Sequence, residues 1–186
     1  TQITGLTATQ VRQLADTQVA ALTATQIKQL TTEELSSFTA TQAAALTTTQ
    51  LTALSTTQIK LLGTTSISSL STAQIQSLST SQLSVLTAGQ MQSLTNTHID
   101  ALSTTQWGAF TSTNLGALTS DQLAALSTDR LTSLSTIQIK GIAVGALSGD
   151  QFAALSSDQF MALTSSQIRA IPVSEIENLT ITQIGL

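Results

Sequence analysis

Residues 23–30 read Thr-Ala-Thr-Gln-Ile-Lys-Gln-Leu, and residues 55–62 read Ser-Thr-Thr-Gln-Ile-Lys-Leu-Leu. The two stretches share one pattern, Thr/Ser-x-x-Gln-apolar-x-x-Leu, which recurs every eight residues along the chain. We call its four fixed positions the cap slot, the glutamine slot, the first apolar slot and the leucine slot. Such self-similarity is the signature of a repeat array, in which neighbouring units bury a shared core.

The two apolar slots are spaced i, i+3, which places them on one face of a helix and on opposite faces of a strand. One uninterrupted helix would turn through about 800° per eight residues, so its apolar stripe would drift by about 80° per unit. A coiled coil, which needs a period of about 3.5 residues, is excluded by the same arithmetic. The helix must therefore end and restart once in every unit.

The restart is provided by the cap slot, whose hydroxyl accepts a hydrogen bond from the amide three residues later. Glutamine at that third position can return a hydrogen bond to the amide of the cap residue, which is the capping-box pattern. Of the 22 cap slots, only Ala15, Gly63 and Pro172 lack a hydroxyl. The sequence therefore predicts an all-α fold, a solenoid or superhelix of very short capped helices with one helix per eight-residue repeat. It does not determine how many repeats make one superhelical coil.

The register of the repeat breaks once. It holds from Gln2 to Gln138, slips by five residues before Gln151, and then resumes. We interpret the slip as five extra residues that lengthen one helix, and we expect a single longer helix over residues 135–147. The solenoid would then cover residues 1–147, with resumed repeats over residues 148–186 after a phase shift. The extra residues are either a tolerated insertion or a joint or assembly contact.

Composition excludes several classes of function. Only 9% of the residues are charged and the formal net charge is −4, so the chain offers no basic surface for nucleic acid. It contains no run of about 18 apolar residues, and we expect no membrane insertion. It has no cysteine, so disulfides are excluded. Because it starts without methionine and stops partway through a unit, we expect it to be a piece of a longer array.

No catalytic, cofactor-binding or metal site is predicted. His98 is the only histidine and occupies a glutamine slot, so it is better explained as a cap-region polar residue than as a base or ligand. One histidine without cysteine makes a zinc site improbable, and no acidic stretch fits a calcium loop. Trp107 and Phe110 occupy the two apolar slots of one unit, which favours a core role over a ligand platform.

The octapeptide resembles tandem repeats of long, low-charge, cysteine-poor regions in large bacterial exported and surface proteins, including adhesin-like ones. The resemblance covers essentially the whole chain and implies a structural or interaction protein, a spacer, stalk or filament-forming segment at the cell surface or outside the cell. The open ends of such a solenoid favour self-association, end-to-end or lateral. The alternative is a binding module whose regular Thr/Gln surface recognises a repetitive ligand such as ice or polysaccharide. We expect no enzymatic activity and no cofactor.

The repeat predicts that packing supplies most of the stability and that the caps mainly set where helices start. We expect Thr47→Ala to lower the free energy of unfolding by about 1 kcal/mol, because it removes one cap. We expect Leu54→Ala to lower it by about 2–5 kcal/mol, because it removes a core side chain. Urea unfolding of the two variants measures both losses, and a costlier cap substitution would contradict this interpretation of the repeat.

Overall fold

The computed structural model describes residues 2–185, and in that range every regular element is a helix. The chain forms two compact units, Thr1–Ser103 (unit 1) and Thr104–Leu186 (unit 2). The α-helices are four to six residues long, and successive helices follow the eight-residue repeat. The predicted solenoid of short helices is therefore confirmed.

Unit 1 contains the 3₁₀-helix η1 (Gln2–Gly5) and the α-helices α1 (Ala8–Arg12), α2 (Asp16–Ala21), α3 (Ala24–Gln29), α4 (Thr32–Ser36), α5 (Ala40–Ala44), α6 (Thr48–Ala53), α7 (Thr56–Leu61), α8 (Thr64–Ser68), α9 (Thr72–Ser77), α10 (Thr80–Ser84), α11 (Ala88–Ser93) and α12 (Asn96–Ala101). Unit 2 contains α13 (Thr104–Gly108), α14 (Ser112–Gly116), α15 (Ser120–Ala124), α16 (Thr128–Thr132), α17 (Thr136–Ile139), the 3₁₀-helix η2 (Val144–Ala146), α18 (Gly149–Ala154), α19 (Ser157–Met161), α20 (Ser165–Arg169), the 3₁₀-helix η3 (Val173–Asn178) and α21 (Ile181–Ile184).

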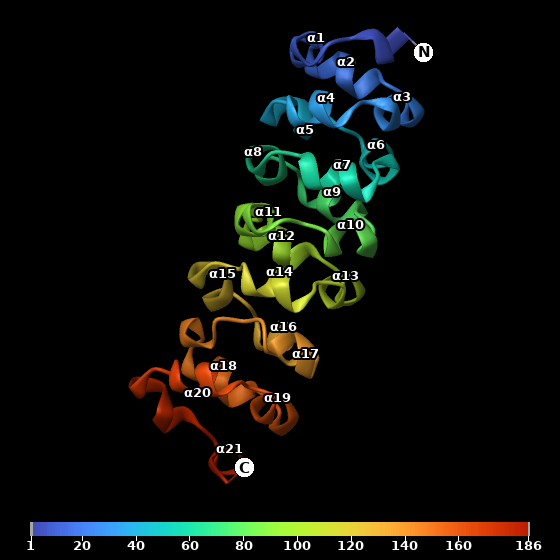
Figure 1. Ribbon diagram of the computed structural model, residues 1–186. Coiled ribbons are helices and arrows are strands. Elements are labelled where there is room, and N and C mark those ends of the chain that lie inside the picture. Colours follow the sequence, from blue (N-terminus) through green and yellow to red (C-terminus); the bar gives the residue numbers. More distant parts are fainter. Residues whose placement is uncertain (1, 186) are drawn as a thin grey trace. The chain divides into compact units, whose positions relative to one another are not determined.

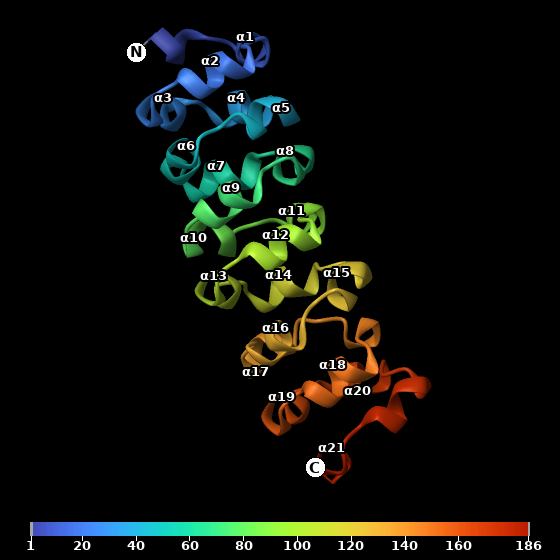
Figure 2. The ribbon, with the colours of Figure 1, turned by 180° about the vertical axis from the view of Figure 1, so that it is seen from behind.

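Within unit 1, each helix packs against the helix three places further along the chain, as α5 does against α8 and α8 against α11. Both views of the ribbon place α3 and α6 on one side of this unit and α5, α8 and α11 on the other (Figure 1, Figure 2). Side-chain hydrogen bonds between coils of this unit span 25 to 31 residues and most often 28 or 31, for example from Gln58 to Leu30 and from Gln90 to Ile59. Since 28/8 = 3.5, one coil holds about three and a half repeats.

The core consists of the two apolar slots of every unit. In unit 1, from Val11 to Ile99, residues in the first apolar slot are at most 1% exposed to solvent. Leucine slots from Leu30 to Leu102 are almost as well buried, including Phe38 in one of them. Burying each such side chain contributes roughly 1.5–3 kcal/mol before conformational entropy is counted, so the apolar pair is the main source of stability.

The predicted capping boxes form along both units. Thr23 is a representative cap residue: its hydroxyl accepts from the amide of Gln26 at 3.2 Å, and its own amide donates to Oε1 of Gln26 at 2.8 Å. Two exceptions occur at cap residues that lack one of the groups a capping box needs. Ala15 has no hydroxyl but still donates its amide to Gln18, whereas Pro172 has no amide, and the segment after it is a 3₁₀-helix.

The expectation of one longer helix over residues 135–147 is wrong. Helix α17 ends at Ile139, and the 3₁₀-helix η2 starts only at Val144, after Ala143 with φ −79° and ψ 83°. Ile142 and Val144 are 2% and 1% exposed. In one continuous helix, residues two apart point about 200° away from each other, so these two side chains could not both enter the core.

The register slip is therefore a shortened repeat, which we call the short unit (residues 143–147). Residues 135–142 make a complete repeat, and the short unit keeps a cap position, a first apolar slot at Val144 and a leucine slot at Leu147. Its first helical turn, including the glutamine slot, is missing. The short unit has five residues in place of eight, so the intervals across it are three residues shorter than the usual 28 and 31. The hydrogen bonds from Gln167 to Ile142 and Ile139 accordingly span 25 and 28 residues. The division into residues 1–147 and 148–186 concerns repeat register and stays a prediction.

Candidate functional site

The most regular chemical feature of the structure is the buried glutamine slot. Gln50 shows its geometry: Oε1 accepts from the amide of its own cap residue, Thr47, at 2.7 Å. Its Nε2 donates to the carbonyls of Val19 and Leu22, at 2.9 and 2.6 Å, on the helix end one coil earlier. The carboxamide thus satisfies a helix start with its oxygen and the end of another helix with its nitrogen.

We call these contacts from a glutamine slot to helix-end carbonyls of the preceding coil the inter-coil ladder. It is made in unit 1 by Gln42, Gln50, Gln58, Gln74, Gln82 and Gln90, and in unit 2 by Gln138, Gln151, Gln159, Gln167 and Gln183. All these side chains are buried, at 1% to 9% exposure. The described residues leave no buried side-chain nitrogen or oxygen without a partner.

The ladder is the part of the structure that the sequence argument missed. A capping box is served equally well by Glu and Gln, because both offer a side-chain oxygen. Only Gln also has a nitrogen that donates, and 17 of the 23 glutamine slots hold Gln while two hold Glu. That preference for the amide was the available signal.

Glu34 shows what the carboxylate loses. It is buried in a glutamine slot, and its Oε2 accepts from the amide of Thr31 at 2.6 Å. The Glu side chain has an oxygen where Gln has its N–H donors, so it does not extend the ladder to Leu6, which lies 28 residues earlier. The hydroxyl of Ser37, directly after the same helix, donates to the carbonyl of Glu34 at 2.6 Å and lies 3.1 Å from the carbonyl oxygen of Ala8 in the preceding coil.

His98 reproduces both functions of glutamine. Its Nδ1 accepts from the amide of Thr95 at 3.3 Å, and its Nε2 lies 2.8 Å from the carbonyl oxygen of Leu70, 28 residues earlier. A carbonyl only accepts, so Nε2 carries the proton and the ring is neutral. Burial lowers the pKa of the His98 imidazole below 6.5, and the hydrogen bond to Leu70 raises the pKa in part. The predicted cap-region role of His98 is confirmed.

Trp107 and Phe110 are core residues, as predicted. Both are buried, with ring centroids 5.6 Å apart in an edge-to-face arrangement. The indole Nε1 donates to the carbonyl of Arg130 at 3.0 Å, and the Arg130 guanidinium lies 5.7 Å from the indole centroid. The aromatic pair is therefore enclosed by its own fold and is not a surface for stacking a ligand.

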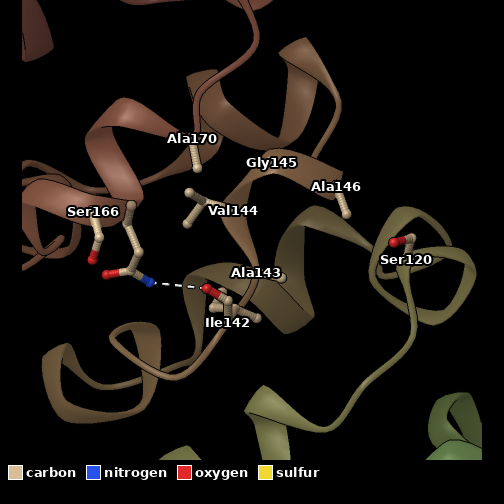
Figure 3. A pocket seen from close by; sticks show the side chains of 9 residues that line it. Ser120, Ile142, Ala143, Val144, Gly145, Ala146, Ser166 and Ala170 are labelled. Carbon is tan, nitrogen blue, oxygen red and sulfur yellow. Dashed lines mark hydrogen bonds between the residues drawn. The ribbon is translucent and has the colours of Figure 1, made fainter.

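A cleft of about 360 Å³ lies beside the short unit in unit 2 (Figure 3). Residues 142–146 line it together with Ser120, Ser166, Gln167 and Ala170. No side chain in this lining titrates, and the Nε2 of Gln167 is held by the carbonyl of Ile142 at 2.9 Å. Two isolated hydroxyls without a base do not make an acid–base or nucleophilic site.

The cleft coincides with a gap in the ladder. The carbonyls of Phe110 and Leu126 accept from Gln138 and Gln151, at 2.8 and 2.7 Å. Among the described residues no side chain donates to the carbonyl of Leu118, because the short unit that should serve it has no glutamine slot.

The described part of the chain also contains no group of three or more acidic, histidine or cysteine residues placed to hold a metal, and no helix long and apolar enough to span a membrane. The expectation of no catalytic, cofactor or metal site stays a prediction.

A family model described as the ALTTAQ repeat matches residues 97–128. No curated protein matches the chain. The matched stretch is 32 residues long, which is four octapeptides (32/8 = 4), and within it residues 101–106 read Ala-Leu-Ser-Thr-Thr-Gln. The chain thus contains a recognised repeat, in agreement with its helical solenoid fold.

The ladder predicts that one substitution has different costs at equivalent repeat positions. Gln82→Glu keeps the acceptor for Ser79 but removes the donor to Leu51 and Leu54, so we expect the free energy of unfolding to fall by about 1–3 kcal/mol. Gln10→Glu is the matched control, because its Nε2 donates to none of the described residues. Urea unfolding at neutral pH measures both, and equal losses would show that the ladder contributes nothing.

His98 predicts a pH dependence of stability. Its pKa is lowered in the folded chain, so the unfolded chain takes up a proton first. The free energy of unfolding is therefore unaffected by His98 above pH 6.5, the pKa of the unfolded chain. It decreases as the pH falls from 6.5 towards the lower pKa of His98 in the folded chain. We expect His98→Gln, which keeps an acceptor and a donor, to remove this loss. Urea unfolding of both proteins above and below pH 6.5 tests it, and identical pH profiles would contradict it.

Proposed function

We propose that this chain is a structural and interaction repeat protein, a spacer, stalk or filament-forming segment at a bacterial surface or outside the cell. The observation that carries the proposal is the inter-coil ladder. Within each unit, coils are joined mainly by Gln side chains that donate to helix-end carbonyls of the preceding coil, and by the same apolar pair. Coils can therefore be added or removed without changing the chemistry of the joint, which is what a protein that sets a distance requires.

The distribution of chemical groups supports this role. Most caps, glutamine-slot side chains and apolar slots are used by the fold itself, and the cleft beside the short unit has no titratable side chain. The ALTTAQ repeat match at residues 97–128 supports a repeat region in the chain. The cell-surface location rests on the resemblance of the octapeptide to repeats of exported bacterial proteins and on the low charge content.

The alternative is a regular Thr/Gln surface for ice or polysaccharide, but most of its glutamine side chains do not lie on the surface. The glutamine side chains of the ladder are buried and hydrogen-bonded, so they cannot contact a ligand outside the fold. Hydroxyls in the cap slot already accept a hydrogen bond from an amide, as Thr47 does from Gln50. The hydroxyls are what remains of such a surface, because the cap residue Thr47 and the two threonines after it, Thr48 and Thr49, are exposed. We therefore propose the structural role.

A register-preserving deletion tests whether the chain sets a distance. Removing residues 31–86 takes out 56 residues, which is seven repeats (56/8 = 7) and two coils (56/28 = 2), and joins Leu30 to a new cap residue at Thr87. We expect the shortened chain to keep its helical circular dichroism per residue. We expect its maximum dimension in small-angle scattering to fall by about 16–20 Å, one helix layer of about 8–10 Å per coil.

An unfolded deletion variant or an unchanged maximum dimension would contradict the spacer role. Retention of the intact chain on ice or on a polysaccharide matrix would instead favour the binding module. The matched control for that assay replaces exposed threonines, Thr48→Ala with Thr49→Ala, which leaves the cap residue Thr47 in place.

A further inference from the structure

We propose that Glu34, together with helix-end carbonyls of the preceding coil, binds a cation that prefers oxygen ligands, calcium or sodium. The ligands are Oε1 of Glu34 and the carbonyl oxygens of Ile3 and Leu6, and we call this place the Glu34 site. The inference goes beyond the proposed structural role and does not rest on it. It also departs from the expectation of no metal site, which concerned acidic, histidine and cysteine side chains, because two of these ligands are backbone carbonyls.

The carbonyl of Leu6 is an exception within unit 1. Each leucine-slot carbonyl from Leu14 to Leu70 accepts a hydrogen bond from the side chain 28 residues later. Since 34 − 6 = 28, the residue that should serve Leu6 is Glu34, which has no N–H in its side chain. In the part of the chain that the structure describes, no group donates to the carbonyl of Leu6.

Glu34 in turn has one carboxylate oxygen without a partner. Its Oε2 accepts from the amide of Thr31 at 2.6 Å, whereas its Oε1 accepts from none of the described residues. No described Lys or Arg pairs with Glu34, although its side chain is only 4% exposed. The other Glu in a glutamine slot, Glu175, is half-buried and accepts from the side-chain amide of Asn178 at 2.9 Å. A buried charge without a counter-charge is costly, so a cation at Oε1 stabilises this one.

The neighbouring repeat shows what Oε1 of Glu34 faces. In Gln42, Oε1 accepts from the cap residue, as Oε2 of Glu34 does, and Nε2 lies 3.0 and 2.8 Å from the carbonyl oxygens of Val11 and Leu14. Helix α4 packs against α1 as α5 packs against α2, so the stacking is the same in both repeats. Oε1 of Glu34 therefore takes the place of the Gln nitrogen and faces the two carbonyls of the Glu34 site. Three oxygens without a proton between them repel one another, and a cation removes that repulsion.

A cation can reach the Glu34 site from solvent. Every fully enclosed side-chain oxygen of the described residues has a partner, so Oε1, which has none, keeps some contact with water. An ion can therefore bind there and retain part of its hydration shell. Carboxylate and carbonyl oxygens are the ligands that calcium prefers, whereas zinc and copper prefer nitrogen and sulfur. With a single negative charge the site binds weakly, and we expect a dissociation constant of about 1 mM for calcium.

Urea unfolding of the whole chain with and without added cations tests the proposal. Choline chloride keeps the ionic strength constant, because screening then stays equal while the large choline ion cannot enter the site. We expect 10 mM CaCl₂ to raise the folding equilibrium constant of the original chain about tenfold, as one bound ion with this affinity requires. A second series with NaCl in place of CaCl₂ shows which of the two ions binds more tightly.

Glu34→Gln is the decisive variant, and Glu33→Gln is its matched control. Each removes one negative charge from α4, but Glu33 is exposed and lies outside the Glu34 site. Glu34→Gln supplies the missing N–H donors to Leu6 and removes the cation ligand. We expect it to be more stable than the original chain in choline chloride alone and to be insensitive to both ions. We expect Glu33→Gln to keep the full cation response of the original chain.

Three results overturn the proposal. An original chain whose stability changes with neither ion has no such site. An equal response of all three proteins is a general salt effect. A Glu34→Gln variant that is no more stable than the original chain in choline chloride alone shows that Oε1 does not face the carbonyls.

Amide NMR locates the bound ion independently of stability. We expect the largest shifts on addition of the stabilising ion at the amides of Thr7, which follows the Leu6 carbonyl, and of Thr31, which donates to Glu34. Shifts confined to other parts of the chain place the ion elsewhere and overturn the proposal.

Discussion

One planar group, the glutamine carboxamide, links the local and the long-range structure of this protein. Its oxygen fixes where a helix begins, and its nitrogen fixes which helix of the preceding coil lies beside that beginning. Because both atoms belong to one rigid group, the start of a helix and the stacking of a coil cannot vary independently. The interval of 28 residues between Gln58 and Leu30 follows from this coupling, and it sets the coil at about three and a half repeats.

The same coupling explains the unusual composition. A helix of four to six residues leaves most of its backbone amides and carbonyls without an intrahelical partner. Charged side chains could satisfy them only with a large cost of desolvation, whereas hydroxyls and carboxamides satisfy them at a lower cost. Gln therefore takes most of the buried polar positions, Thr and Ser take the cap slots, and most charges lie on exposed positions. The low charge content of the chain is a consequence of how many helix ends it must satisfy.

Local features of the fold were predictable from sequence, because they depend on patterns within eight residues. The cap at Thr23, the burial of Ile27 and Leu30 and the cap-region role of His98 all follow from spacing and side-chain chemistry. The number of repeats per coil did not follow, because it depends on how far a Gln nitrogen reaches beyond its own unit. The candidate site was missed for the same reason: the second bond of each glutamine is invisible within one repeat.

The short unit was misread for a different reason. Ile139, Ile142, Ala146 and Leu147 fit a helical spacing, and that spacing concealed Val144, which the continuous helix would have turned outward. Gly141 was the contrary signal: a Cβ there would collide with the backbone carbonyl of Ser112, so the chain passes very close to the preceding coil at that point. A repeat with three residues missing places Val144 and Leu147 in the two apolar slots. An insertion into one longer helix does not.

The short reach of the ladder has a consequence for how the chain acquires its structure. The ladder bonds of Gln42 reach back at most 31 residues, to Val11. A coil can therefore close as soon as the residues of that one interval are available, whatever the state of the rest of the polypeptide. Loops of this length close quickly, and contacts between sequence neighbours favour rapid folding. A chain delivered progressively, by a ribosome or through an export pore, can fold turn by turn from whichever end emerges first.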